Sequence, residues 1–322
     1  MNKQLSNKIA NANVFLTILI VMLHFGYANN RILSYITDMA VPCFFSISSF
    51  LYFWSFDWNS PSNSYLYKLK SRFKSVVIPF IIFNIIAYAV FVVIRYYKDG
   101  IFTFDDFSLR KIWLNQFDMP TWYLKTLYQF VIVAPVIGYI IKKSKYSILF
   151  FFFSLPIGVK FHYGNLLFFL PSIILGSYIS MYYKRISSVL YEKKDMLKIL
   201  IPVSIIIIIV LFLIFEYNQD KKQFLYYIYR QVSPIFIIII YLKINIIPDR
   251  LYRLIKPYTF FIFCSHWMIF NIINAIFLNK HPFSIFSFFL MELVFTFSIL
   301  ILLGYILKVK NNPIWQVING GR

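Results

Sequence analysis

The stretch Asn11-Ala-Asn-Val-Phe-Leu-Thr-Ile-Leu-Ile-Val-Met-Leu-His24 is an apolar run that extends a few residues on each side, far enough to form a membrane-spanning helix. Of the 322 residues in the chain, 60% are hydrophobic and only 14% are charged. Soluble domains do not contain that much apolar surface. The stretch and the composition together predict a polytopic membrane protein.

The apolar runs predict helices rather than the strands of an outer-membrane barrel. Barrel strands alternate with a period of two, whereas a run such as Ile205 to Val210 is apolar at every position. We therefore expect an all-α polytopic membrane protein with about ten transmembrane helices. Read from the apolar runs and the breaks between them, the predicted spans are residues 9–28, 36–56, 75–97, 121–141, 146–160, 164–182, 197–216, 225–243, 257–278 and 284–307.

The span 146–160 is the one on which the predicted orientation depends. Pro156, Gly158 and Lys160 crowd its end, so it can also be interpreted as a tilted helix or a half-span. If it does not cross the membrane, every later segment is inverted.

The net charge of +20 indicates orientation in the membrane rather than a nucleic-acid partner. Of the 32 lysines and arginines, 21 fall in alternate loops on one side of the predicted spans, and eight of the 12 acidic residues lie elsewhere. The positive-inside rule places the basic loops in the cytoplasm. We expect both termini in the cytoplasm, an even number of spans, and a single transmembrane domain over residues 1–322 without a soluble domain.

Several other classes of protein have no support in the sequence. Cys43 and Cys264 both lie in apolar spans without metal-ligand spacing, so we expect small packing residues and no metal site. The patterns GxGxxG, GxxxxGK[ST], GxSxG and HExxH do not occur. Lys3 and Lys8 ahead of the first apolar run also fit a cleavable signal peptide, but a multi-span protein needs none.

His24 is the first candidate for chemistry because an ionisable group inside a membrane span is costly and usually functional. A neutral imidazole can remove a proton from a hydroxyl near physiological pH. Eleven residues make about three helical turns, so Asn13 and Thr17 share a helix face with His24. The structural alternative is a buried histidine that is satisfied by a neighbouring carbonyl.

Five short motifs occur in order along nearly the whole chain. They are the first span ending in Val21-Met-Leu-His24 with Val41-Pro-Cys-Phe-Phe-Ser-Ile-Ser-Ser-Phe-Leu51 after it, Lys68-Leu-Lys-Ser-Arg-Phe-Lys-Ser-Val-Val-Ile-Pro-Phe80, Thr121-Trp-Tyr-Leu124, Phe168-Phe-Leu-Pro-Ser-Ile-Ile-Leu-Gly176, and Tyr258-Thr-Phe-Phe-Ile-Phe-Cys-Ser-His266. In that order they resemble the VPxFFxxSGF, KRxxRLxIPY, LWFL, FFxxGxxL and SxxxYLxH runs of the integral-membrane acyltransferase family 3, whose members O-acylate sugars of bacterial envelopes.

The resemblance implies an O-acetyltransferase in the bacterial cytoplasmic membrane. The acetyl group would pass from cytoplasmic acetyl-CoA to a hydroxyl of an envelope polysaccharide, such as a capsule, O-antigen or exopolysaccharide, or of its lipid-linked precursor. His24 would be the catalytic histidine, either as a general base or as a transient carrier of the acyl group. The implied partners are an acyl-CoA co-substrate, a glycan acceptor and membrane lipids, with no bound cofactor and no nucleic acid.

Further residues are weaker candidates. Arg72 and Lys74 would bind the CoA phosphates, or serve only as a topology signal that attracts anionic lipid. Possible substrate-cavity residues are Trp122, Tyr123, Lys125, His266 and Glu292. Alternatively the two aromatic residues belong to an interfacial belt, the lysine snorkels to the interface and the histidine is structural. The glutamate needs a partner or a water-filled cavity.

Four positions depart from the family pattern. The family has an arginine where Asn13 stands and an aspartate where Ala10 stands, while Ser75 and Ser49 replace a basic residue and a glycine. Asparagine can form hydrogen bonds but cannot neutralise a phosphate. The alternatives to an acyltransferase are a non-enzymatic carrier or flippase of lipid-linked sugars, and an oligosaccharide polymerase. Polymerases usually carry a larger outer loop than the one of about 23 residues found here.

Overall fold

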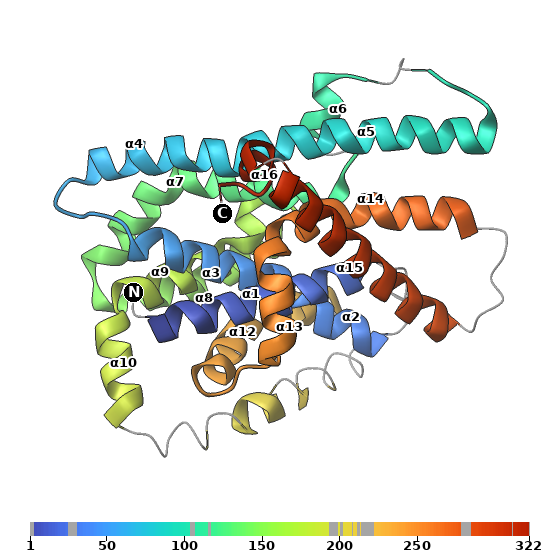
Figure 1. Ribbon diagram of the computed structural model, residues 1–322. Helices are drawn as coiled ribbons and strands as arrows, with labels where there is room; N and C mark the ends of the chain where they lie inside the picture. The colour runs from blue at the N-terminus through green and yellow to red at the C-terminus, as the bar shows by residue number, and fades with distance from the viewer. Residues whose placement is uncertain are drawn as a thin grey trace. The chain divides into compact units, whose positions relative to one another are not determined.

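The computed structural model describes residues 3–24, 31–103, 107–114, 117–192, 222–277, 285–310 and 312–321, with a few positions between 199 and 213. Every regular element in this part of the chain is a helix, which confirms the predicted all-α fold class (Figure 1). The α-helices are α1 (Lys3–His24), α2 (Arg31–Asp38), α3 (Ala40–Trp54), α4 (Pro61–Arg72), α5 (Ile78–Asp99), α6 (Leu109–Trp113), α7 (Trp122–Lys143), α8 (Leu149–Gly158), α9 (Leu170–Met181), α10 (Tyr183–Glu192), α12 (Lys222–Lys243), α13 (Asp249–Ile255), α14 (Thr259–Phe277), α15 (Ile285–Lys310) and α16 (Asn312–Ile318).

Seven helical stretches are long and apolar enough to cross a membrane, which confirms the predicted polytopic character. They are Lys3–His24, Leu33–Trp54, Pro61–Asp99, Met119–Lys143, Phe224–Tyr241, Asp249–Ile276 and Phe289–Lys310. Nine of the ten predicted spans coincide with a helix, and half of the positions of the remaining one, 197–216, lie outside the described residues. The total number of spans and the positions of the termini stay predictions.

The fifth predicted span contains the short helix α8, which directly follows the 3-10 turn Lys145–Ile148. With 10 residues and a rise of about 1.5 Å per residue, α8 covers roughly half of a hydrocarbon core of about 30 Å. The next predicted span is also short, because α9 has 12 residues and follows a 3-10 turn. The apolar helical stretch Lys145–Gly158 is shorter than the seven candidate spans, and whether it crosses the membrane stays a prediction.

A π-helical turn, Phe73–Val77, joins α4 to α5. Pro79 has no N–H, and its ring would clash with the carbonyl four residues earlier, so the α-helical ladder cannot continue through Ser75. The Ile78 N–H bonds instead to the Phe73 oxygen, and the turn widens. The released Ser75 carbonyl faces Gly320, where a Cβ atom would lie 2.7 Å from the carbonyl oxygen. Gly320 has a φ of +65°, which also favours glycine.

The contacts group the chain into two compact units. The first comprises residues 1–16, 38–67 and 129–248, and the second comprises residues 17–37, 68–128 and 249–322.

Within the first unit, α3 and α9 pack closely because small residues line both helices. The Ser46 hydroxyl donates to the Ser172 carbonyl at 2.8 Å. A Cβ atom at Gly176 would overlap the Ser46 carbonyl oxygen and the Ser49 hydroxyl. Small residues allow helix backbones to approach in this way inside membranes. Two of the motifs recognised in the sequence, 41–51 and 168–176, therefore pack against each other.

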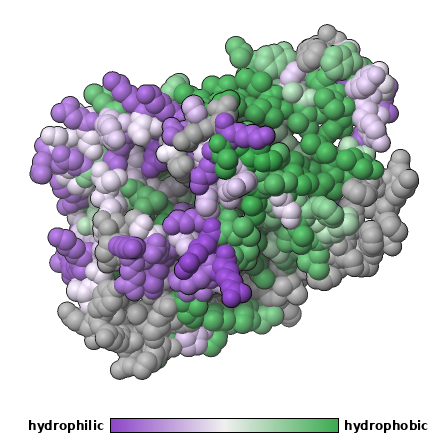
Figure 2. Space-filling model, in the orientation of Figure 1, coloured by the Kyte–Doolittle hydropathy of each residue, from purple (hydrophilic) through white to green (hydrophobic). Residues whose placement is uncertain are grey.

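Within the second unit, α14 and α15 form an antiparallel pair, drawn in orange and red in Figure 1. Gly304 of α15 packs directly on the Tyr258 ring just before α14. Figure 2 shows a continuous hydrophobic surface over α5, α14 and α15. The exposed apolar side chains of α5 and α15 include Ile85, Phe91 and Phe295. Such a surface is what a membrane-spanning helix presents to lipid.

Candidate active site

Two histidines from distant parts of the chain lie together in the second unit. His24 is the last residue of α1, and His266 lies near the middle of α14. The distance between His266 Nε2 and His24 Nδ1 is 3.1 Å, which is hydrogen-bonding distance. The ring centroids are 5.0 Å apart and the planes are inclined by 51°. The sequence selected both residues but could not show that they form a pair.

Backbone carbonyls lie within hydrogen-bonding distance of one nitrogen of each ring. The Nδ1 atom of His266 lies 2.8 Å from the Phe263 oxygen and 3.1 Å from the Ile262 oxygen. The Nδ1 atom of His24 lies 2.9 Å from the Ile20 oxygen. His266 has 0% of its surface exposed, whereas His24 is partly exposed. Of the two imidazoles, His24 is therefore the one that a substrate can reach.

Aromatic rings surround the pair. The Trp267 ring meets His24 edge-on, with ring centroids 5.6 Å apart. The Tyr123 ring meets the Phe263 ring at 5.5 Å, and the Phe263 carbonyl is the one that holds His266. Tyr123 is buried, while its predicted companion Trp122 is partly exposed. Of the two predicted aromatic residues, Tyr123 thus packs on the segment that carries His266.

A buried polar network at the start of α7 was not recognised in the sequence. The Asn84 amide donates to the Thr121 hydroxyl at 2.9 Å, and its oxygen accepts from the Asp118 main-chain N–H at 3.3 Å. The Thr121 hydroxyl donates to the Asp118 carbonyl at 2.7 Å. Both carboxyl oxygens of Asp118 are buried and have no hydrogen-bond partner among the described residues. Burial raises the pKa of this carboxyl well above its usual value.

The other predicted cavity residues have different surroundings. Lys125 is partly exposed, and its Nζ donates to the Trp113 carbonyl at 3.2 Å, at the end of the short helix α6. Glu292 is buried in α15, and its Oε1 atom has no hydrogen-bond partner in the described part of the chain. Thr296, one turn later, is buried with an unpartnered hydroxyl under the same restriction. Lys125 thus anchors α6, whereas Glu292 introduces a polar face into an apolar helix.

The remaining predicted residues lie on α1 and at the π-helical turn. Thr17 is fully buried and Asn13 is partly exposed. Arg72 is partly exposed and Lys74 is exposed. Both basic side chains are therefore accessible to a ligand or to a lipid headgroup. Within the described residues, no three histidine, cysteine or carboxylate side chains gather as a metal site would require.

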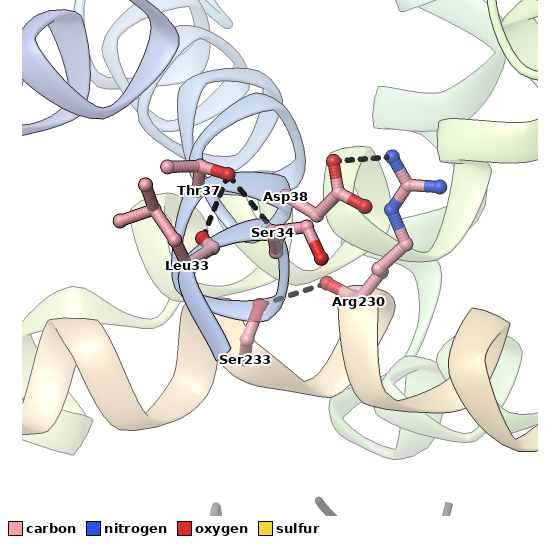
Figure 3. A network of polar contacts seen from close by, with 6 residues as sticks. All are labelled: Leu33, Ser34, Thr37, Asp38, Arg230 and Ser233. Carbon is pink, nitrogen blue, oxygen red and sulfur yellow. Dashed lines mark hydrogen bonds and ion pairs between the residues drawn. The ribbon is translucent and has the colours of Figure 1, made fainter. Parts of the chain in front are cut away.

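The first unit contains an ion pair that the sequence also did not reveal (Figure 3). Arg230 and Asp38 lie 3.3 Å apart, and their side chains are 12% and 13% exposed. The guanidinium stacks 4.3 Å from the Tyr163 ring centre and 5.1 Å from that of Tyr226. The arginine inside the apolar run 225–243 was the signal that could have found it, because intramembrane charges need partners.

One comparison with known proteins identifies the family. A family model described as an acyltransferase domain matches residues 11–308, which is most of the chain. The matched region includes the part of α1 that ends in His24 and the whole of α14 with His266. No curated protein and no solved structure matches the chain. The chain belongs to the integral-membrane acyltransferase family 3.

Proposed function

We propose that this membrane acyltransferase is an O-acetyltransferase that uses cytoplasmic acetyl-CoA and acts on a hydroxyl of an envelope polysaccharide or of its lipid-linked precursor. Membership of the family supports acyl transfer in a membrane. The donor, the acceptor and the location in the bacterial cytoplasmic membrane are the parts that we add.

The observation that carries the proposal is His24, a partly exposed residue at the end of α1 whose imidazole is held by a buried histidine. A hydroxyl is a weak nucleophile until a base removes its proton. In the proposed reaction His24 takes the proton of the acceptor hydroxyl while the oxygen attacks the thioester carbonyl carbon. The C–S bond breaks, and the departing CoA thiolate takes the proton from His24. The products are the acetyl ester and free CoA.

The donor site is proposed at the basic residues around the π-helical turn. Arg72 and Lys74 are accessible there, and CoA carries several phosphate charges that basic side chains bind by charge-assisted hydrogen bonds. The acetyl group sits at the end of the long pantetheine arm of CoA. The nucleotide can therefore remain at the cytoplasmic surface while the thioester reaches deeper into the protein.

The proposed orientation can be tested separately. With both termini in the cytoplasm, Lys143 lies inside and Asp99 lies outside. Single cysteines at these positions, in a variant without the two native cysteines, should differ in labelling by an impermeant maleimide. Labelling of intact cells at 143 but not at 99 would reverse the orientation and move the proposed donor site to the outer surface.

The decisive experiment compares His24→Ala with His162→Ala, which changes an exposed histidine in a loop. Membranes that contain each protein are incubated with radiolabelled acetyl-CoA and envelope glycan. Loss of a positioned base typically lowers the rate by about 10²–10⁴-fold. His24→Ala should therefore abolish detectable transfer at normal protein abundance, while His162→Ala should not. Wild-type transfer by His24→Ala would refute the catalytic assignment and favour a non-enzymatic carrier of lipid-linked sugars.

A further inference from the structure

We propose that His266 is a positioning residue that keeps a proton on Nδ1 of His24 and thereby leaves Nε2 of His24 as the reactive nitrogen. The hydrogen-bond pattern follows from the geometry of the pair. Its catalytic meaning rests on the proposed function.

The proton of His266 is located by its backbone partners. A carbonyl oxygen only accepts hydrogen bonds, so a ring nitrogen bonded to a carbonyl must carry a hydrogen. Nδ1 of His266 lies 2.8 Å from the Phe263 oxygen and 3.1 Å from the Ile262 oxygen. A neutral imidazole has one N–H, so Nε2 of His266 carries a lone pair.

The proton of His24 is then located by two independent contacts. Nε2 of His266 is 3.1 Å from Nδ1 of His24, and its lone pair can only accept. The Ile20 oxygen, 2.9 Å from the same Nδ1, also can only accept. Both contacts require a hydrogen on Nδ1 of His24. Nε2 of His24 therefore has the free lone pair that can take a proton or an acyl group.

The burial of the two rings assigns their roles. His266 is fully buried and cannot touch a substrate, whereas His24 is partly exposed. When Nε2 of His24 gains a proton, its Nδ1–H bond to His266 becomes charge-assisted and stronger. A base whose orientation is set by a third group is the usual arrangement in nucleophilic catalysis. Here the chain of hydrogen bonds runs from the Phe263 carbonyl through His266 to His24, which would act on the substrate.

The hydrogen-bond pattern can be tested without measuring activity. The chain has only four histidines, so selective 15N-histidine labelling of the full-length protein in detergent gives a simple NMR spectrum. Couplings from the ring hydrogens identify which nitrogen is protonated, and His24→Gln and His266→Gln assign the signals. We expect the Nδ1–H form for both residues. A proton on Nε2 of His24 in the wild-type protein would overturn the proposal.

Substitution of His266 tests whether this residue keeps His24 in the Nδ1–H form. His266→Leu fills the site but offers no acceptor, so His24 should become a mixture of tautomers. His266→Gln offers an amide oxygen to Nδ1–H and should keep the single form. If His24 remained entirely Nδ1–H in His266→Leu, the Ile20 carbonyl alone would hold it, and His266 would not be the positioning residue.

Kinetics give the second readout. Loss of a hydrogen bond that strengthens in the transition state corresponds to about 10- to 100-fold in rate. His266→Leu should lower kcat by that factor while both KM values stay near wild type, and His266→Gln should recover most of it. Equal rates for the two variants, or a change confined to KM, would remove the positioning role. A wild-type protein without acetyl transfer would instead refute the proposed function, and NMR would still decide the hydrogen-bond pattern.

Discussion

Replacement of Asp118 by asparagine should stabilise the protein and remove part of its pH dependence. The carboxyl is buried, and both of its oxygens lack hydrogen-bond partners among the described residues. Asparagine has nearly the same shape and is neutral at every pH. The main-chain bonds of residue 118 to Asn84 and Thr121 do not involve its side chain, so they remain available to the variant.

The magnitude follows from linkage between protonation and folding. Burial raises the pKa of Asp118 in the folded protein, so the folded state binds its proton more tightly than the unfolded state does. Stability is then highest below the unfolded pKa of about 3.9 and falls as the pH rises toward the folded pKa. The loss amounts to about 1.4 kcal/mol for each pH unit in that interval. Asp118→Asn lacks this contribution.

Thermal unfolding of both proteins in the same detergent, in a series of buffers upward from about pH 4.5, measures the effect. Other titrating groups contribute equally to both, so the difference between the two curves is the quantity of interest. It should be small at the acidic end and grow with pH in favour of the variant. A difference that does not change with pH, or a variant less stable throughout, would show that the carboxylate has a partner and ionises in the folded protein.

Three further predictions concern the proposed donor site, the packing of α3 on α9 and the buried ion pair. Arg72→Ala should raise the KM for acetyl-CoA about 5- to 10-fold with little change in kcat. Lys143→Ala removes the same charge elsewhere and should leave steady-state kinetics unaltered. Equal effects of the two variants on KM would mean that both side chains serve only as topology signals. Gly176→Ala should destabilise the protein by about 1–3 kcal/mol, because its methyl group would overlap a carbonyl of α3. The measurement is a lower Tm. An unchanged Tm would mean that α3 and α9 can move apart without loss of stability. Arg230→Ala should lower the free energy of unfolding by about 3–5 kcal/mol, because it leaves Asp38 buried without its cation. The double variant Asp38→Leu/Arg230→Met should recover most of the lost Tm. No recovery would contradict the ion-pair explanation.

Composition and span length alone determined the fold class. In lipid every backbone N–H and C=O must be bonded within the protein, so only helices and closed barrels can span a membrane. A run that is apolar at every position lacks the period of two of a barrel strand, which leaves a helix. The same local argument selected His24, because a single imidazole within an apolar span is conspicuous without any knowledge of its contacts. The shortness of the helix in the fifth span was also suggested locally, by Pro156, Gly158 and Lys160 at the end of that span.

The tertiary structure alone decided which side chains meet. His24 and His266 are 242 residues apart in sequence, and their contact depends on how α1 and α14 are rotated about their axes. Helices that are apolar on every side carry no hydrophobic face from which this rotation could be read. The Arg230–Asp38 pair and the burial of the Asp118 carboxyl likewise depend on contacts between segments far apart in the sequence. Polar partners inside a membrane protein are selected by close packing between helices, which a single sequence does not encode in any local pattern.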